Sequence, residues 1–142
     1  MEGGNVGQQS SFVISPYVGV GPLRFGMGAE EVALHLGAAE DNFVDFLKRR
    51  VEIRAGVSTK YNRKGQLNEV SFLKSERVIL DGIALFTDKA VLARLDALDA
   101  ATESVGFRIY MGLGIAMTGF GKSRETRTLS VFARELRKLW KE

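Results

Sequence analysis

The sequence predicts an α+β fold, mainly an antiparallel sheet with two or three helices. Several short segments alternate apolar and polar residues, which is typical of strands with one buried face. Two other segments place apolar residues at helical spacing. The tetrapeptide Arg63-Lys64-Gly65-Gln66 separates two strand-like segments in the manner of a hairpin turn. Together these patterns indicate neighbouring strands that run in opposite directions.

Length and composition indicate one domain. The chain has 142 residues, of which 45% are hydrophobic and 26% are charged, close to the average for a soluble globular domain. A chain of this length buries enough surface to fold without disulfides or metal. We expect residues 1–11, rich in Gly, Gln and Ser, to form a disordered lead-in, and residues 12–142 to form a single α+β domain.

The first elements are an extended segment and a helix. Residues 12–25 carry β-branched and aromatic residues interrupted by Gly and Pro, which predicts extended chain with a turn. Residues 29–36 place Val32 and Leu36 on one apolar face and carry acidic residues in their first turn. Gly37 then provides a stop signal. We therefore expect a helix over residues 29–36.

The middle of the chain predicts a sheet. Val70 and Phe72 share one face of a strand, while Glu69 and Ser71 share the other. Asp81-Gly82 is a turn signal that ends the series. The predicted strands cover residues 43–46, 51–53, 57–62, 67–73 and 77–80.

The last third contains the strongest helix signal, at residues 88–101, with Asp88 as the expected N-cap. Alternation over residues 105–111 predicts a strand, and a turn at 112–114 leads to a second strand ending at Met117. Residues 128–133 alternate like a strand but also fit a helical pattern. We favour a strand followed by a short basic helix.

A weak internal repeat relates two parts of the chain. The spacing of Gly21, Phe25, Val32 and Leu36 resembles that of Gly82, Phe86, Val91 and Leu95. Each copy would comprise a turn, a helix and antiparallel strands. The domain is therefore a candidate for two similar helix-plus-hairpin halves, although chance similarity explains so short a pattern equally well.

Composition excludes several classes of site. The chain has no Cys and one His, which removes thiol nucleophiles, zinc–thiolate sites and most metal sites. The first eleven residues have neither the charge nor the apolar run of a signal peptide, so we expect a cytoplasmic protein without a membrane partner. The net charge of +3 suits an acidic partner, and the chain suggests no cofactor.

Residues 116–123, AMTGFGKS, match a relaxed phosphate-loop pattern. In such a loop, Lys122 would contact phosphates and Ser123 would hold magnesium. Only 19 residues follow Ser123, however, and the surrounding strands predict hairpins, whereas these enzymes use a parallel sheet. A nucleotide-binding protein remains an alternative, and a Gly-rich turn between antiparallel strands is the interpretation that we favour.

No catalytic residue stands out. His35 follows Glu31 by one helical turn and lies off the apolar face, as expected for a solvated residue. The carboxylate pairs Glu30/Glu31 and Asp96/Asp99 fit helix surfaces, where caps and ion pairs explain them. We therefore predict no enzyme activity, no catalytic residue and no metal ligand.

Two groups of basic and aromatic residues are candidates for binding a partner: Lys60, Tyr61 and Arg63, and Arg108 with Tyr110. Basic residues interleaved with aromatics are typical of a nucleic-acid-binding module, which stays an alternative that we rank below a solvated sheet face. Tyr and Arg are also common anchors at protein interfaces. We predict partner binding through these five residues, and the possibility of a homodimer stays open.

A family resemblance supports the protein-binding interpretation. Residues 19–27, GVGPLRFGM, followed by Glu30-Glu31-Val32 and Leu36-Gly37, resemble the opening of small bacterial immunity proteins encoded beside polymorphic toxins. A "G…LF" segment like residues 82–86 and a "GI" strand like residues 114–115 also resemble that family, so that the likeness covers most of residues 17–120.

The resemblance implies a cytoplasmic protein that neutralises a cognate toxin by binding it, in interbacterial competition such as type VI secretion. The toxin would be encoded by the adjacent gene. A related pattern occurs in β-lactamase-inhibitor-like and barrel-assembly lipoprotein domains. Those proteins are exported, and the signal peptide and lipidated Cys that they carry are not expected in this chain.

Overall fold

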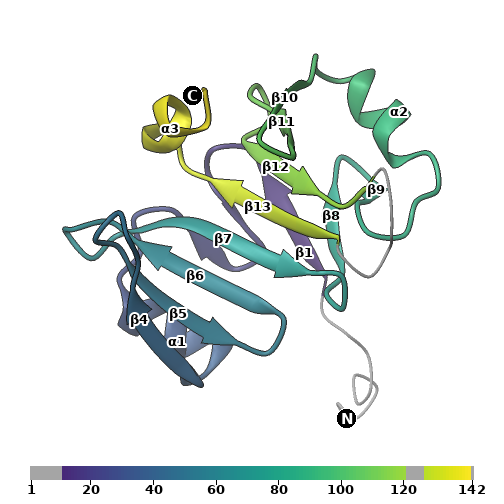
Figure 1. The fold of residues 1–142 in the computed structure, drawn as a ribbon. Helices are drawn as coiled ribbons and strands as arrows, with labels where there is room; N and C mark the ends of the chain where they lie inside the picture. Colours follow the sequence, from purple (N-terminus) through teal and green to yellow (C-terminus); the bar gives the residue numbers. More distant parts are fainter. Residues whose placement is uncertain (1–10, 121–126, 142) are drawn as a thin grey trace, which may run out of the picture.

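The computed structural model of the chain describes residues 11–120 and 127–141 (Figure 1). The fold is mostly β, with 40% of residues in strands and 17% in helices, arranged as two sheets and three α-helices over the described residues. The predicted antiparallel sheet is confirmed. The balance differs from the prediction, because strands contribute far more of the structure than helices do.

The larger sheet has eight strands, and every neighbouring pair is antiparallel. The two central strands, β7 and β13, pair with Glu69 opposite Phe132. The strands in spatial order are β10 (Thr102–Ser104), β11 (Phe107–Tyr110), β12 (Ile115–Thr118), β13 (Thr128–Phe132), β7 (Leu67–Leu73), β6 (Val57–Tyr61), β5 (Arg50–Arg54) and β4 (Asp41–Val44).

The smaller sheet lies behind the larger one in the view of Figure 1. It contains one parallel pair, β1 with β8, which is an exception to the antiparallel prediction. This pair brings residues 12–13 beside residues 78–79 and so joins the beginning of the domain to its middle. The strands in spatial order are β3 (Leu23–Arg24), β2 (Gly19–Val20), β1 (Phe12–Ser15), β8 (Val78–Leu80) and β9 (Ile83–Ala84).

Helix α1 (Ala29–Leu36) has the predicted bounds and buries Val32. Helix α2 (Val91–Asp96) is much shorter than the predicted helix over residues 88–101. The Asp88 carboxylate accepts the Ala90 N–H at 2.8 Å, which forms a turn before the helix instead of a cap on it. At the other end, the Asp99 carboxylate accepts the Gly112 N–H at 2.8 Å and ties the chain to the β11–β12 turn.

The C-terminal prediction of a strand followed by a short helix is confirmed. After β13, a single 3-10 turn over residues 134–136 leads into α3 (Arg137–Lys141). The interpretation of this segment as one continuous helix is therefore wrong. Antiparallel pairing with both β12 and β7 fixes residues 128–132 as a central strand.

Two strand predictions need local correction. The strand expected over 43–46 is β4, residues 41–44, because the Asp45 carboxylate accepts the N–H groups of Leu47 and Arg49 at 2.9 Å and turns the chain. The strand expected over 105–111 begins only at Phe107. Val105 and Gly106 instead form the turn between β10 and β11.

The two faces of the larger sheet differ in what covers them. The covered face carries the main apolar core, and it packs against the smaller sheet, α1 and α2. The other face, which we call the open face, is turned toward the viewer in Figure 1. The register places small polar residues in one row across its centre, namely Ser58, Ser71 and Ser130.

Candidate partner-binding surface

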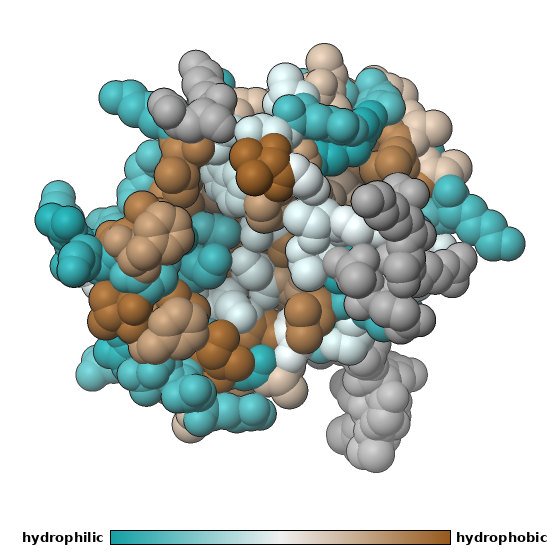
Figure 2. Space-filling model, viewed as in Figure 1, coloured by the Kyte–Doolittle hydropathy of each residue, from teal (hydrophilic) through white to brown (hydrophobic). Residues whose placement is uncertain are grey.

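The open face is hollowed by a groove of about 440 Å³. Figure 2 shows this face, with pale residues in the hollow and apolar residues beside it. Three charged residues lie in the groove, Arg49, Lys60 and Glu69. Its apolar lining comes from two hairpin turns, strand β11 and the C-terminal helix: Phe46, Leu47, Val105, Phe107, Ile109, Leu139 and Trp140. We call these ten residues, together with Ser104 and Ser130, the open-face groove.

The charged residues of the groove are paired with one another. The Arg49 guanidinium donates to Glu69 at 2.8 Å and to Asp45 at 3.1 Å, and the Lys60 ammonium lies 3.5 Å from Glu69. Burial alone would raise the pKa of Asp45, but N–H donors from Arg49 and Leu47 together with the Arg49 guanidinium hold that pKa below its usual value. Two cations and two carboxylates thus form a balanced network, which is the usual condition for charges that are largely buried.

Three apolar side chains of the groove are exposed to solvent. Phe46 is 87% exposed and Val105 is 91% exposed, and Leu139 is 41% exposed. Phe46 belongs to the turn after β4, Val105 to the turn after β10 and Leu139 to α3. Isolated exposed apolar residues are common on protein surfaces, but three around one hollow are typical of an interaction site.

The turn that carries Val105 is strained. Ser104 pairs with Phe107, so Val105 and Gly106 are the two central residues of a hairpin turn, with φ values of 50° and 85°. Positive φ at both positions is typical of a type I′ turn, which favours Asn or Asp followed by Gly. A left-handed conformation costs a residue with a Cβ atom about 1–2 kcal/mol, and β-branching adds crowding. Val105 is therefore an unfavourable residue at this position.

Aromatic packing fixes α3 against the open face. The Trp140 ring stacks on Phe132 with centroids 5.5 Å apart and meets Phe107 edge-on at 4.9 Å. Tyr17 contacts Phe132 from the other side at 6.0 Å, and its hydroxyl donates to the Met111 carbonyl oxygen. Desolvation raises the pKa of the Tyr17 phenol. These contacts hold Leu139 and Trp140 at the side of the groove.

The five residues predicted to bind a partner do not share one surface. Lys60 lies in the open-face groove, and Arg63 is exposed in the β6–β7 turn. Tyr61 is 1% exposed on the covered face, where its hydroxyl donates to Glu52 at 2.8 Å. Burial is the largest cause that raises the pKa of Tyr61 to about 12. The prediction that Tyr61 meets a partner is therefore wrong, because the side chain belongs to the core.

Tyr110 is also a core residue, with no exposed surface. Its hydroxyl donates to Asp96 at 2.8 Å and accepts from the Arg108 guanidinium at 2.9 Å. Arg108 also donates to both Asp96 oxygens at 2.8 Å and to Glu103 at 2.8 Å, so its hydrogen-bonding capacity is used within the chain. Desolvation by burial raises the pKa of Tyr110. Arg108 and Tyr110 thus fasten α2 to β11 instead of forming a free binding surface.

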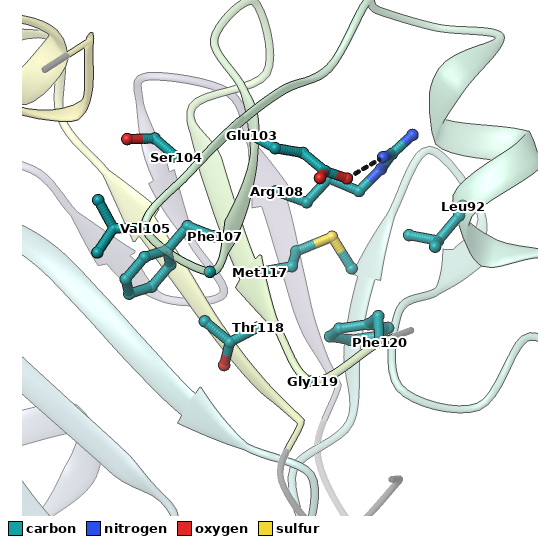
Figure 3. Close-up of a pocket in the computed structure, with 11 residues that line it drawn as sticks. Leu92, Glu103, Ser104, Val105, Phe107, Arg108, Met117, Thr118, Gly119 and Phe120 are labelled. Atoms are coloured by element: carbon teal, nitrogen blue, oxygen red, sulfur yellow. Dashed lines mark hydrogen bonds and ion pairs between the residues drawn. The ribbon is translucent and has the colours of Figure 1, made fainter. Parts of the chain in front are cut away.

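A second cavity of about 730 Å³ lies beside α2 and the β10–β12 strands (Figure 3). It is lined by Arg108, Met117 and Phe120, and also by Val105, which borders both cavities. Thr118, Gly119 and Phe120 of the phosphate-loop pattern lie here, whereas Gly121, Lys122 and Ser123 fall outside the described residues. Strand β12 is antiparallel to both neighbours, unlike the parallel strand that a phosphate loop follows.

The sequence contained a signal for one of the residues that our prediction missed. Val105-Gly106 stands between two alternating segments, where a hairpin needs Asn-Gly or Asp-Gly, so a valine there is conspicuous. Phe46 had no such signal, because a phenylalanine two residues after Val44 fits the alternating pattern of a strand. Leu139 fits the apolar side of a short helix, and its exposure depends on the tertiary packing of α3.

His35 is exposed on α1, and the described part of the chain contains no cluster of three or more His, Asp or Glu side chains placed to hold a metal. Within residues 11–120 and 127–141, no helix is long and apolar enough to cross a membrane. Comparisons with protein-family models, curated proteins and solved structures found no match.

Proposed function

We propose that this chain is a cytoplasmic immunity protein that neutralises a cognate bacterial toxin by binding it with the open-face groove. The observation that supports this proposal most directly is the set of three exposed apolar residues around a hollow in the uncovered face of the sheet. A buried core contributes stability, but exposed Phe46, Val105 and Leu139 contribute little to the chain alone. A partner that covers them would gain from burying their apolar surface.

Charge favours an acidic partner. Exposed Lys48 and Lys138 are adjacent in sequence to the groove residues Leu47, Arg49 and Leu139. The chain as a whole carries a net charge of +3. An acidic surface on the toxin would be attracted to this side of the groove. If the toxin is a nuclease, a basic protein does not mimic nucleic acid, so we expect it to bind away from the nucleic-acid cleft.

We also infer that the domain consists of two similar helix-plus-sheet halves. Helix α1 is followed by β4 to β7 and α2 by β10 to β13, and the two four-stranded series meet at β7 and β13. A short hairpin with a Gly at positive φ precedes each helix, with Gly21 at 59° and Gly82 at 78°. On this view the turns that carry Phe46 and Val105 are equivalent turns of the two halves.

The proposal is tested by measuring the affinity of the purified chain for the purified toxin encoded by the adjacent gene. Phe46→Ser removes an exposed ring from the groove, whereas Leu34→Ser removes an equally exposed apolar residue, 85% exposed, from α1 on the other side of the sheet. We expect Phe46→Ser to weaken binding at least about tenfold, as for an aromatic anchor. Leu34→Ser should bind like the wild type.

Both variants should keep the stability of the wild type, because neither side chain is buried. Thermal unfolding of each variant serves as the control for folding. Equal affinity of Phe46→Ser and wild type would refute the groove as the binding site. The absence of any complex between wild type and toxin at micromolar concentration would refute the immunity function itself.

A further inference from the structure

The turn at Val105 places a β-branched residue in an unfavourable backbone conformation and leaves its side chain largely exposed. Val105 has a positive φ of 50°, which a β-branched residue adopts rarely. Its side chain is 91% exposed, so packing offsets little of the strain. Strained residues that persist are concentrated at functional sites. The combination of strain and exposure therefore requires an explanation outside the folded monomer.

The two-residue turn of the β8–β9 hairpin provides an internal comparison. Leu80 pairs with Ile83, so Asp81 and Gly82 are the two central residues of the β8–β9 turn, with φ values of 50° and 78°. The φ values are close to those of Val105-Gly106, but the sequence Asp-Gly is the one that a turn with positive φ at both central residues favours. The chain thus uses the favourable residue at one turn and an apolar, branched residue at the other.

At Tyr17, a further residue with positive φ, side-chain contacts within the chain offset the unfavourable backbone conformation. Its φ is 64°, and its ring lies 4.5 Å beneath the Arg134 guanidinium and packs against Phe132. Its hydroxyl donates to the Met111 carbonyl oxygen. Tyr17 therefore gains contacts from its strained conformation, whereas Val105 is directed into solvent.

We propose that Val105 is the apolar anchor of the interface, inserted into an apolar recess of the toxin when the chain binds it; this inference rests on the proposed function. The position suits the role, because Val105 stands at the tip of a hairpin and borders both cavities. Figure 3 shows its side chain beside Phe107 and apart from Leu92, at the side of the pocket away from α2. A rigid two-residue turn presents the side chain in one orientation, which lowers the entropic cost of binding.

The charges next to the groove define the recess further. Lys48 and Lys138 are exposed and adjacent in sequence to the groove residues Leu47 and Leu139. A recess that receives Val105 and carries Asp or Glu side chains at its border would match both the apolar tip and these cations. The partner surface that we infer is thus an apolar pocket with an acidic border.

The test is a variant whose stability and affinity change in opposite directions. Val105→Asn creates the favoured Asn-Gly turn, so we expect its melting temperature to rise by about 3–5 °C. The same change removes the apolar anchor, so its affinity for the purified toxin of the adjacent gene should fall at least about tenfold. Val105→Ile keeps an apolar side chain at the tip and should retain affinity within about threefold.

Asp81→Val is the matched control, because it places a valine in the β8–β9 turn, which does not border the open-face groove. Its melting temperature should fall by several degrees, about the reverse of the Val105→Asn effect, and its affinity should stay at the wild-type value. A Val105→Asn protein that melts below the wild type would overturn the inference, because Val105 would then be a structural residue.

The binding results separate this inference from the function on which it rests. If wild type binds the toxin and Phe46→Ser weakens it, but Val105→Asn binds as tightly as wild type, the anchor is refuted and the groove stands. If the wild type does not bind the toxin at all, both the proposed function and the proposed role of Val105 as an anchor are refuted. A more stable Val105→Asn protein with weakened binding supports both.

Discussion

The covered and open faces of the eight-stranded sheet are made by the same strands but have opposite properties. On β7, Val70 and Phe72 point into the core with 0% and 1% exposure, while Ser71, between them, lies on the open face. The covered face is filled by the smaller sheet, α1 and α2. The open face carries a smaller buried cluster at one end, where Leu136, α3 and Tyr17 pack against Phe132 and its neighbours. The main apolar core thus lies on one face of the sheet, and the proposed partner would bind the other face beside its smaller cluster.

The buried polar networks on the two faces also have different structural roles. On the covered face, Glu52, Arg54 and Tyr61 satisfy one another, and Arg54 also donates to the Gly37 carbonyl oxygen at 3.0 Å, which ties β5 to the end of α1. On the open face, Arg49 and Glu69 form a similar pair at the floor of a groove. Buried polar networks of this kind fix geometry more than they add stability. The first network positions a helix, and the second shapes a surface.

The largest decrease in the free energy of unfolding should come from truncating a core side chain on the covered face. Phe72→Ala deletes a ring packed 5.0 Å from Phe12, and we expect it to lower the free energy of unfolding by about 3–5 kcal/mol. Ser71→Ala, the next residue on the same strand, loses one open-face hydrogen bond to Ser130 of 2.9 Å and should lower it by only about 1 kcal/mol. Urea denaturation of both variants measures the contrast, and similar losses would contradict the distinction between the faces.

A smaller effect should appear in alkaline solution. The three tyrosines of the chain, Tyr17, Tyr61 and Tyr110, all have raised phenol pKa values, and burial is the largest cause for each. The unfolded chain ionises its phenols near pH 10, before the folded chain does. The stability from these phenols is therefore complete below about pH 10 and is lost as pH rises toward 12, where Tyr61 titrates.

An absorbance titration of the phenols provides the measurement. At about pH 10, where free tyrosine is half ionised, we expect the folded protein to show clearly less than half of its tyrosine ionised. The free energy of unfolding should decrease steadily above that pH. Normal titration of all three phenols in a protein that is still folded would contradict the burial of Tyr61 and Tyr110 on the covered face.

Local patterns predicted most strands of the larger sheet and their antiparallel directions because hairpins depend on nearby residues, but they did not predict β9 or β10. The bounds of α1 and β7 follow directly from apolar spacing and from Val70-Ser71-Phe72 alternation. The length of α2 could not be predicted in this way, since Asp88 forms a turn with Ala90 and Asp99 accepts the Gly112 N–H from the β11–β12 turn, contacts that depend on side-chain geometry. The parallel pairing of β1 with β8 joins segments more than sixty residues apart, which no local pattern encodes.

The proposed binding surface was harder to predict for the same reason. Tyr61 and Tyr110 carry residue types common at interfaces, but alternation places them on the covered face with Thr59 and Arg108. Which face remains open depends on where the smaller sheet packs, and that is decided by tertiary structure. Lys60, one register step from Tyr61, is the predicted residue that the structure places in the groove.

The most direct test of the account is hydrogen–deuterium exchange of the chain alone and with the purified toxin of the adjacent gene. The account predicts that the toxin slows exchange in the two turns that border the groove, residues 45–49 and 104–107, and in α3. Exchange in α1, on the covered face, should stay unchanged. Protection confined to α1 or the smaller sheet, with both turns unaffected, would contradict binding through the open face.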